Sequence, residues 1–216
     1  MAAISGKVAR IRYTSATATS STDNAATLAP GGLTLTIDAD AKKAWDRDVS
    51  TALKVYDGST LVPTSQYADV AWPIGQVTLS SARSTGNTYT VDVESFTKNY
   101  LCGGRSWSLD VDVDMLDVTS FSCTGGTVQW RSYKPGLSQA SVGITGLLST
   151  QYSTGPVWYD RIAADTDVVV ELEVGTVGQW TGYGIINRDN VTESVDGLTE
   201  EAIDLQIDGQ IYWTTG

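Results

Sequence analysis

The chain has 216 residues, with 14 lysines and arginines, 25 aspartates and glutamates, and no histidine, so its formal net charge is −11. The absence of histidine excludes the usual Ser-His-Asp and Cys-His nucleophile arrangements. The acidic excess also disfavours a protein that grips nucleic acid, because contacts to phosphate need lysine and arginine.

The N-terminal part of the sequence predicts a strand, a linker, a second strand and a helix. Residues 8–13 alternate apolar and basic side chains, which indicates a short strand. Residues 14–32 are rich in Ser, Thr, Ala and Gly without a periodic apolar face, and they predict a linker or a long flexible loop. A strand is then expected at 33–37 and a short helix at 39–46, with Asp38 as its cap.

A compact β-rich module is predicted to follow. Residues 54–62 contain an Asp-Gly turn between two apolar stretches, which is typical of a hairpin. A second hairpin is expected at 67–79 and a further alternating strand at 89–93. These elements predict a small β module over about 30–97.

The stretch 107–115 shows strict alternation and predicts a half-buried strand. Its apolar members are expected to lie in the core: Leu109, Val111 and Val113. Its carboxylates are expected to share the open face: Asp110, Asp112 and Asp114.

These carboxylates do not match a metal site. Along a strand they repeat every ~6.6 Å, too far apart to share one ion. Counted from Asp110, the glycine and glutamate positions of an EF-hand loop hold Met115 and Phe121. Cys102 and Cys123 are too few for a disulfide framework and indicate free buried thiols or one bridge. The sequence therefore predicts no metal and no cofactor, and leaves open whether the carboxylates form a solvated face or line a channel.

The C-terminal part predicts one helix and several strands. A helix is expected at 156–164, where a proline opens a segment with one apolar face. Strands are expected at 168–174 and at 180–187, the latter with a glycine-associated bulge. A final hairpin is predicted over 191–207.

Five short motifs over about forty residues resemble the tail-tube (major tail) proteins of long-tailed bacteriophages. They are Trp-Ser-Leu at 107–109, Asp-Val-Thr-Ser-Phe at 117–121, Trp-Arg at 130–131, Pro-Gly-Leu at 135–137, and the alternating strand after Ala140. The later order of helix, strand and a Gly-Tyr-Gly-Ile-Ile strand is also similar to that family.

The resemblance implies a mainly β fold: a tail-tube-type β-sandwich with one short helix, carrying an inserted small β-rich module. The sandwich domain would comprise residues 1–13 and 98–216. Residues 14–97, the linker plus the module at about 30–97, would be the insertion, because more than eighty residues separate the first strand from the Trp-Ser-Leu motif.

The resemblance also implies a structural virion protein without enzymatic activity. Its subunits would form stacked rings, hexameric in most relatives, that house the tape-measure protein and let DNA pass without specific binding. The implied lumen-facing acidic residues are Asp110, Asp112 and Asp114. The implied subunit-interface residues are Asp117, Val118, Thr119, Ser120, Phe121, Trp130, Arg131, Pro135, Gly136 and Leu137.

The distribution of charge fits this hypothesis but has a second interpretation. Residues 99–216 hold sixteen acidic and five basic residues, whereas residues 1–98 hold nine of each. An acidic channel would repel DNA and let it slide, yet the same charge would also simply keep a soluble domain in solution.

The sequence has no apolar run near twenty residues and no stretch of signal-peptide type, so no membrane partner and no Sec export are expected. The predicted location is the virion tail, assembled in the host cytoplasm. Two alternatives remain open. One is another virion part, a capsid decoration or tail-terminator subunit. The other is a carbohydrate-binding β-sandwich, suggested by seven Trp and ten Tyr.

Overall fold

The computed structural model describes residues 10–49, 53–101, 104–118, 131–147, 157–164, 166–193 and 199–215. Across these ranges the chain is mainly β with one short α-helix, α1 (Val157–Ala163), which confirms the predicted fold class and the predicted helix. Cys102 and Cys123 lie outside the described residues. None of the helices in these ranges is long and apolar enough to cross a membrane.

Thirteen strands form one antiparallel network, in the order β4-β3-β7-β1-β10-β11-β12-β9-β8, with β2, β6 and β5 branching from β1 and β13 pairing with β11. In the described residues between the early strands lie three 3₁₀ turns: η2 (Asp40–Lys42), η4 (Thr64–Gln66) and η5 (Trp72–Ile74). The strands are β1 (Ile11–Leu28), β2 (Thr34–Ile37), β3 (Lys54–Asp57), β4 (Thr60–Val62), β5 (Tyr67–Ala71), β6 (Gln76–Leu79), β7 (Tyr89–Tyr100), β8 (Gly104–Asp117), β9 (Tyr133–Leu147), β10 (Val168–Val174), β11 (Gly178–Thr192), β12 (Glu200–Ile207) and β13 (Tyr212–Thr215).

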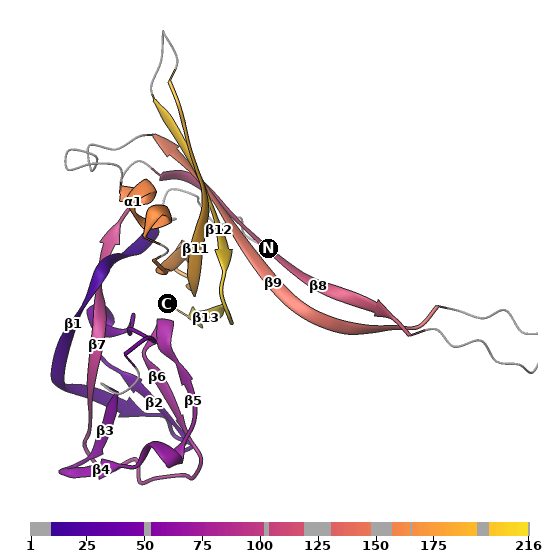
Figure 1. Cartoon of the computed structure of the whole chain (residues 1–216). Helices are drawn as coiled ribbons and strands as arrows, with labels where there is room; N and C mark the ends of the chain where they lie inside the picture. The colour runs from indigo at the N-terminus through magenta and orange to yellow at the C-terminus, as the bar shows by residue number, and fades with distance from the viewer. Residues whose placement is uncertain are drawn as a thin grey trace, which may run out of the picture.

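The molecule has three visible regions (Figure 1). Strands β2 to β6 form one lobe together with one end of β1 and of β7. Strands β10 to β13 and α1 form a second lobe. The strand pair β8–β9 leaves the second lobe and projects away from it as a long curved arm.

Each lobe has its own hydrophobic core. The first cluster joins the start of β1 to strands β9 to β12 and α1, and its most buried members are Leu172, Val168, Ile203 and Leu205. The second cluster lies among β1, β2, β3, β6 and β7, and its most buried members are Trp45, Val55, Val77 and Val91. Since β1 and β7 run through both lobes, the division into a sandwich of 1–13 plus 98–216 and an inserted module stays a prediction.

The predicted linker at 14–32 is wrong for residues 14–28, which belong to β1. Its middle part pairs with β7, from Ala18 opposite Phe96 to Ser21 opposite Val93, with register shifts on both sides of this stretch. Ser and Thr accept extended backbone readily, and a neighbouring strand satisfies their N–H and C=O groups. The low hydrophobicity of residues 14–28 therefore reflects a strand that largely faces solvent, and not a loop.

The predicted helix at 39–46 is also wrong beyond a single turn. Only Asp40–Lys42 forms a 3₁₀ turn, and its preceding residue makes no side-chain capping bond. Ala44 and Trp45 are fully buried, and the backbone N–H of Trp45 donates to Trp72 O at 3.0 Å. Trp45 also forms an isolated bridge with Ser95 of β7. Packing of this tryptophan against β7 and η5 requires extended backbone, and that overrides the local helical pattern.

Both hairpins predicted for the β-rich module are confirmed. β3 pairs with β4, and Asp57 lies opposite Thr60 across a turn in which Gly58 has φ +61°. Glycine occupies this conformation without steric cost. β5 pairs with β6 across η5. The final strand, β13, was not predicted, because its four residues follow a Gly-containing turn and alternate only weakly.

Candidate subunit interface

The arm consists of the distal parts of β8 and β9. β9 pairs with β12 only from Ser141 to Leu147, whereas it pairs with β8 from Gly146 down to Tyr133. Residues 133–140 therefore have β8 as their single strand partner among the described residues. A two-stranded ribbon without a covering layer is only marginally stable in water. This geometry indicates that the arm lies against something else when the protein functions.

One side of the arm is apolar and uncovered. Trp107 and Leu109 are partly buried against the core of the second lobe. The next residues on the same side, Val111 and Val113, are 56% and 43% exposed. The prediction that both valines lie in the core is therefore wrong. Alternation correctly put them on the core side of β8, but the layer that covers this side ends near Leu109.

The exposed apolar surface continues toward the tip. Met115 is 60% exposed, Leu116 57% and Leu137 81%. Met115 alternates with Val111 and Val113, whereas Leu116 lies on the side of Asp114, where a Cβ on Gly136 would come within 3.4 Å of both side chains. We call these five exposed apolar residues of the arm the arm stripe. Exposed single hydrophobic residues are ordinary, but several of them close together on a projecting ribbon are typical of a protein–protein contact.

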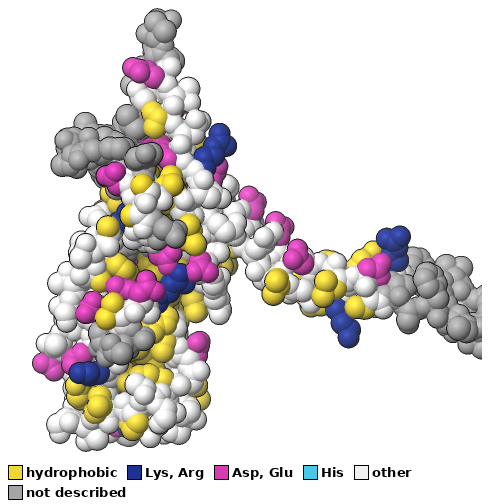
Figure 2. Space-filling model, in the orientation of Figure 1, with side chains coloured by type: hydrophobic (Ala, Val, Ile, Leu, Met, Phe, Trp, Pro, Cys, Tyr) yellow, Lys and Arg dark blue, Asp and Glu magenta, His cyan; other side chains and the backbone are white. Residues whose placement is uncertain are grey.

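The other side of the arm carries the predicted row of carboxylates. Asp110, Asp112 and Asp114 are all exposed. Opposite the first two, β9 places Ser141 and Gln139. None of the three aspartates forms an ion pair with a described residue, and no metal-binding group of side chains is found among the residues that the structure describes. Figure 2 shows acidic side chains in a row along the arm, with hydrophobic side chains exposed beside them.

The carboxylate row continues into an open polar face on β8, β9, β12 and β11. Small side chains dominate this face: Ser106 and Thr145 lie 2.5 Å apart through their hydroxyl oxygens. A Cβ on Gly143 would come within 3.0 Å of the Ser108 hydroxyl, so glycine keeps the two strands closely paired here.

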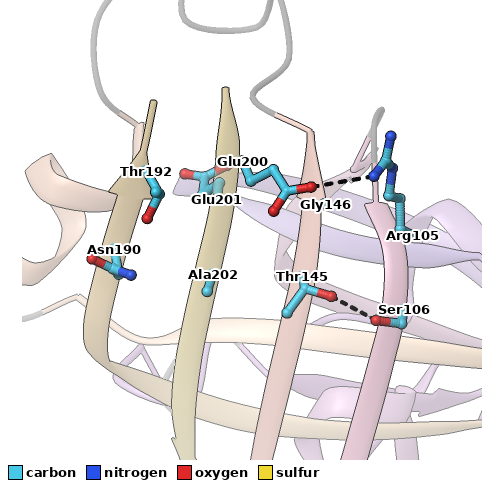
Figure 3. Close-up of a pocket in the computed structure, with 9 residues that line it drawn as sticks. All are labelled: Arg105, Ser106, Thr145, Gly146, Asn190, Thr192, Glu200, Glu201 and Ala202. Carbon is cyan, nitrogen blue, oxygen red and sulfur yellow. Dashed lines mark hydrogen bonds and ion pairs between the residues drawn. The ribbon is translucent and has the colours of Figure 1, made fainter. Parts of the chain in front are cut away.

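A shallow depression lies at one end of this open face, where the four strands present the residues drawn in Figure 3. Arg105 lies 3.3 Å from the carboxylate of Glu200, and both side chains are more than half exposed. On the same face Arg188 lies 3.7 Å from Asp204. Arg105 and Arg188 are therefore each partnered by a carboxylate, and they offer little net positive charge to a phosphate backbone.

Glu201 is a buried acid that no sequence pattern indicated. Its side chain belongs to the core-facing set of β12, with Ile203 and Leu205, and the residue is 6% exposed. Burial raises the pKa of the Glu201 carboxyl to about 7. The alternation of β12 could have predicted this burial. Glu201 lies two residues before Ile203 and four before Leu205, so it shares their core-facing side.

The structure places six of the ten predicted interface residues. Five of them lie toward the tip of the arm, in β8, just after it, or in β9: Asp117, Val118, Pro135, Gly136 and Leu137. Arg131 lies just before β9. The other four lie outside the described residues: Thr119, Ser120, Phe121 and Trp130. That these ten residues contact another subunit stays a prediction, as does the lumen-facing role of the three aspartates.

No family model matches the chain, and no curated protein matches it. Among solved structures, the chain is similar to one from the tail of an empty gene transfer agent (GTA) particle computed with helical refinement and C6 symmetry. That match has 17% identity and a TM-score of 0.46, and covers 55% of this chain and 87% of that one.

A chain from the virion of a native gene transfer agent particle matches with 18% identity and a TM-score of 0.45, over 56% of this chain and 89% of that one. A chain from the six-fold symmetrised baseplate of the anti-feeding prophage matches with 12% identity and a TM-score of 0.36, over 55% and 85%. All three come from tail, virion or baseplate assemblies, which is the kind of assembly that the sequence motifs resemble. Because the TM-scores are below 0.5, the proposed function rests on the arm and on the sequence motifs, and not on these similarities.

Proposed function

We propose that this chain is a non-enzymatic structural protein of a phage-type tail, a subunit that self-assembles into the tail tube. The observation that carries the proposal is the arm: a long strand pair whose apolar stripe has no cover among the described residues. The motifs that resemble tail-tube proteins lie on or beside this arm, which ties the resemblance to a physical feature.

Assembly would bury the arm stripe against a neighbouring copy. Full burial of a valine or methionine side chain contributes about 1.5–3 kcal/mol, so burial of Val111, Val113 and Met115 would favour such a contact. β8 is also the edge of the sheet among the described strands, and none of those strands pairs with its outer side, which would let a strand of another subunit pair there. A ring closes when each subunit offers such an edge to the next.

In such a ring the open polar face would line the channel. Asp110, Asp112 and Asp114, with the small polar side chains of β8, β9 and β12, would present carboxylates and hydroxyls to the lumen. DNA would be repelled and would slide through. Before ejection the same channel would hold the tape-measure protein. The proposed setting is therefore a virion tail of stacked hexameric rings, assembled in the host cytoplasm without a membrane.

The two alternatives are distinguished by what the aromatic and apolar groups do. A carbohydrate-binding module needs exposed rings for stacking on sugars. Here Trp45 and Trp158 are buried, and Trp213, 38% exposed, packs on Trp180 with ring centroids 5.0 Å apart. A capsid decoration or tail-terminator subunit would also self-associate, but it would stop at one ring or a trimer and would not stack into tubes.

Size-exclusion chromatography with light scattering, followed by negative-stain electron microscopy of the full chain, tests the proposal. Rings or tubes are expected at high protein concentration. A Val111→Ser/Val113→Ser variant should keep its fold and need about tenfold or more protein to assemble, because it removes part of the buried apolar area. A matched control, Leu33→Ser/Leu61→Ser, removes two similarly exposed apolar side chains from the other lobe and should assemble as the wild type does. A wild-type chain that stays monomeric, with and without tape-measure protein, contradicts the proposal.

A further inference from the structure

A group of four charged side chains lies where the two lobes meet; three of them are largely buried and the fourth, Asp40, is 50% exposed. We call it the junction cluster: Arg12 of β1, Lys98 of β7, Glu171 of β10 and Asp40 of η2. These residues come from four elements that are far apart in the sequence. The side chains of Lys98 and Glu171 are only 6% and 3% exposed, and that of Arg12 is 13% exposed.

Glu171 lies at the centre of the junction cluster. One of its carboxylate oxygens is 2.6 Å from Lys98 Nζ, and the other is 2.7 Å from Arg12 Nε. The second contact is an ion pair without hydrogen-bond geometry, so its attraction is Coulombic. Arg12 also donates from Nη2 to the amide oxygen of Gln179 at 2.8 Å. These contacts hold β1, β7, β10 and β11 in one arrangement.

Asp40 connects this group to the first lobe. Its carboxylate accepts hydrogen bonds from Arg12 Nη1 at 2.7 Å and from Lys98 Nζ at 3.2 Å. Asp40 belongs to η2, which follows β2, a strand of the second hydrophobic cluster. Two cations of the long shared strands are thus placed between a carboxylate of each lobe, Asp40 on one side and Glu171 on the other.

A second polar contact joins the same two lobes. Arg47 forms ion pairs with Asp167, just before β10, and with Asp208, just after β12, and its guanidinium lies 4.6 Å from the ring centroid of Tyr183. The hydroxyl of Tyr183 donates to the carbonyl oxygen of Trp45. The segment after η2 is therefore held to the second lobe by charge and by an aromatic ring.

The apolar contact between the lobes is small in comparison. It consists of the third cluster, in which the buried members are Ala44, Phe96, Val169 and Tyr183. Four side chains, one of them alanine, bury little area beside the thirteen residues of each main cluster. Apolar contact is also non-directional, whereas ion pairs between fixed groups need one geometry.

We propose that the junction cluster sets the orientation of the first lobe relative to the second, so that the lobes behave as one rigid body instead of a module on a tether. Buried ion pairs add little net stability compared with apolar groups of the same size, but they specify one arrangement, since any other leaves charges unpaired away from water. The proposal concerns a single subunit and is independent of tube assembly.

The test is a distance measurement between the lobes by double electron–electron resonance. Spin labels are placed at Lys54→Cys in β3 and Asn190→Cys in β11, both exposed positions, with Cys102 and Cys123 replaced by serine. Labelled chains are diluted in excess unlabelled protein, so that only distances within one subunit are read even if rings form. The wild-type background should give one narrow distance peak.

Two substitutions in the junction cluster are compared. Glu171→Gln leaves Lys98 and Arg12 short of their central carboxylate and should lower the melting temperature. The neutral pair Asp40→Ala/Lys98→Met removes two opposite charges, breaks the contact of the junction cluster with η2 and leaves Arg12 paired with Glu171. It should fold, with a melting temperature above that of the single variant, but it should lose the single narrow peak. Arg188→Met, which breaks an exposed ion pair of the same sheet, should keep the wild-type peak and melting temperature.

Three results would overturn the proposal. The first is a neutral pair variant that keeps the narrow wild-type peak, which would mean that the Arg47 contacts, the apolar packing or the shared strands set the orientation without the junction cluster. The second is a neutral pair variant that fails to fold, which would give the junction cluster a role in stability instead of orientation. The third is an Arg188→Met control that broadens the peak equally.

Discussion

Two consecutive strands, β7 and β8, carry the same apolar–polar alternation and have opposite burial. In β7, Val91 and Val93 are 0% and 2% exposed, because β3 and β1 flank this strand and the other strands of the first lobe cover its inner side. In β8, Val111 and Val113 are 56% and 43% exposed. Alternation thus shows which residues share a side of a strand, but a second layer must be present for that side to be buried. For β8, the described residues provide no such layer, and we propose that another copy of the chain provides it.

The largest effect is expected in β7. Val91→Asp would put an unpaired carboxylate in the second hydrophobic cluster, and the free energy of unfolding should fall by about 3–5 kcal/mol. Chemical denaturation followed by circular dichroism measures this change. An unfolding curve like that of the wild type would mean that this core opens to water more readily than its burial indicates.

The same substitution in β8 should separate stability from assembly. Val111→Asp changes a residue that is exposed in the single chain, so the free energy of unfolding should change by less than about 0.5 kcal/mol. Association should weaken by about 2–3 kcal/mol, because the new carboxylate would lose water in the subunit contact. Sedimentation velocity over a range of concentrations measures the association. If Val111→Asp unfolds the chain as Val91→Asp does, the comparison between the two strands fails.

Glu201 should make stability depend on pH in the second lobe. Its pKa is raised from 4.5 to about 7 by burial, so the native state binds its proton more tightly than the unfolded chain between these values. The free energy of unfolding should therefore fall as the pH rises from about 4.5 to 7, with about 1–2 kcal/mol of the fall due to this group. Glu201→Gln should make the free energy of unfolding less dependent on pH between about 4.5 and 7, even if the substitution also changes the stability at any one pH. An unchanged slope in denaturation experiments across this range would assign the proton uptake to another group.

The smallest effect on the fold is expected for the carboxylates of the arm. The triple variant Asp110→Asn/Asp112→Asn/Asp114→Asn should unfold within about 0.5 kcal/mol of the wild type, since all three side chains are exposed. If these groups line a channel, assembled particles of the variant should retain added double-stranded DNA at low salt, and wild-type particles should not. Equal retention by both would remove the proposed role of the acidic row.

The elements with clear periodicity were predictable from the sequence, and the errors have physical causes. Hairpins β3–β4 and β5–β6 and strands β10 and β12 follow local turn chemistry and alternation. The strand character of residues 14–28 was missed because its pairing with β7 depends on residues about seventy positions away. The local pattern predicts a helix at Trp45, but contacts with η5 and β7 outweigh that pattern and keep the segment extended.

The candidate site was predictable only in part. Alternation identified the two sides of β8, but it could not show that the core layer ends near Leu109, because that depends on where β12 stops pairing with β9. The junction cluster was not predictable at all, since its four charged residues belong to separate elements and each has an ordinary sequence context.

The central claim is that the arm stripe is covered by another copy of the chain, and its most direct test is the accessibility of Val113 in assembled and dissociated protein. A single cysteine, Val113→Cys with Cys102 and Cys123 replaced by serine, is labelled with a water-soluble maleimide in both states. We expect rapid labelling of the single chain and a labelling rate at least about tenfold lower in the assembled particles, because close-packed contacts exclude the reagent. A cysteine introduced at Leu61, on the other lobe, should label equally in both states. Equal labelling of Val113→Cys in both states would contradict the claim.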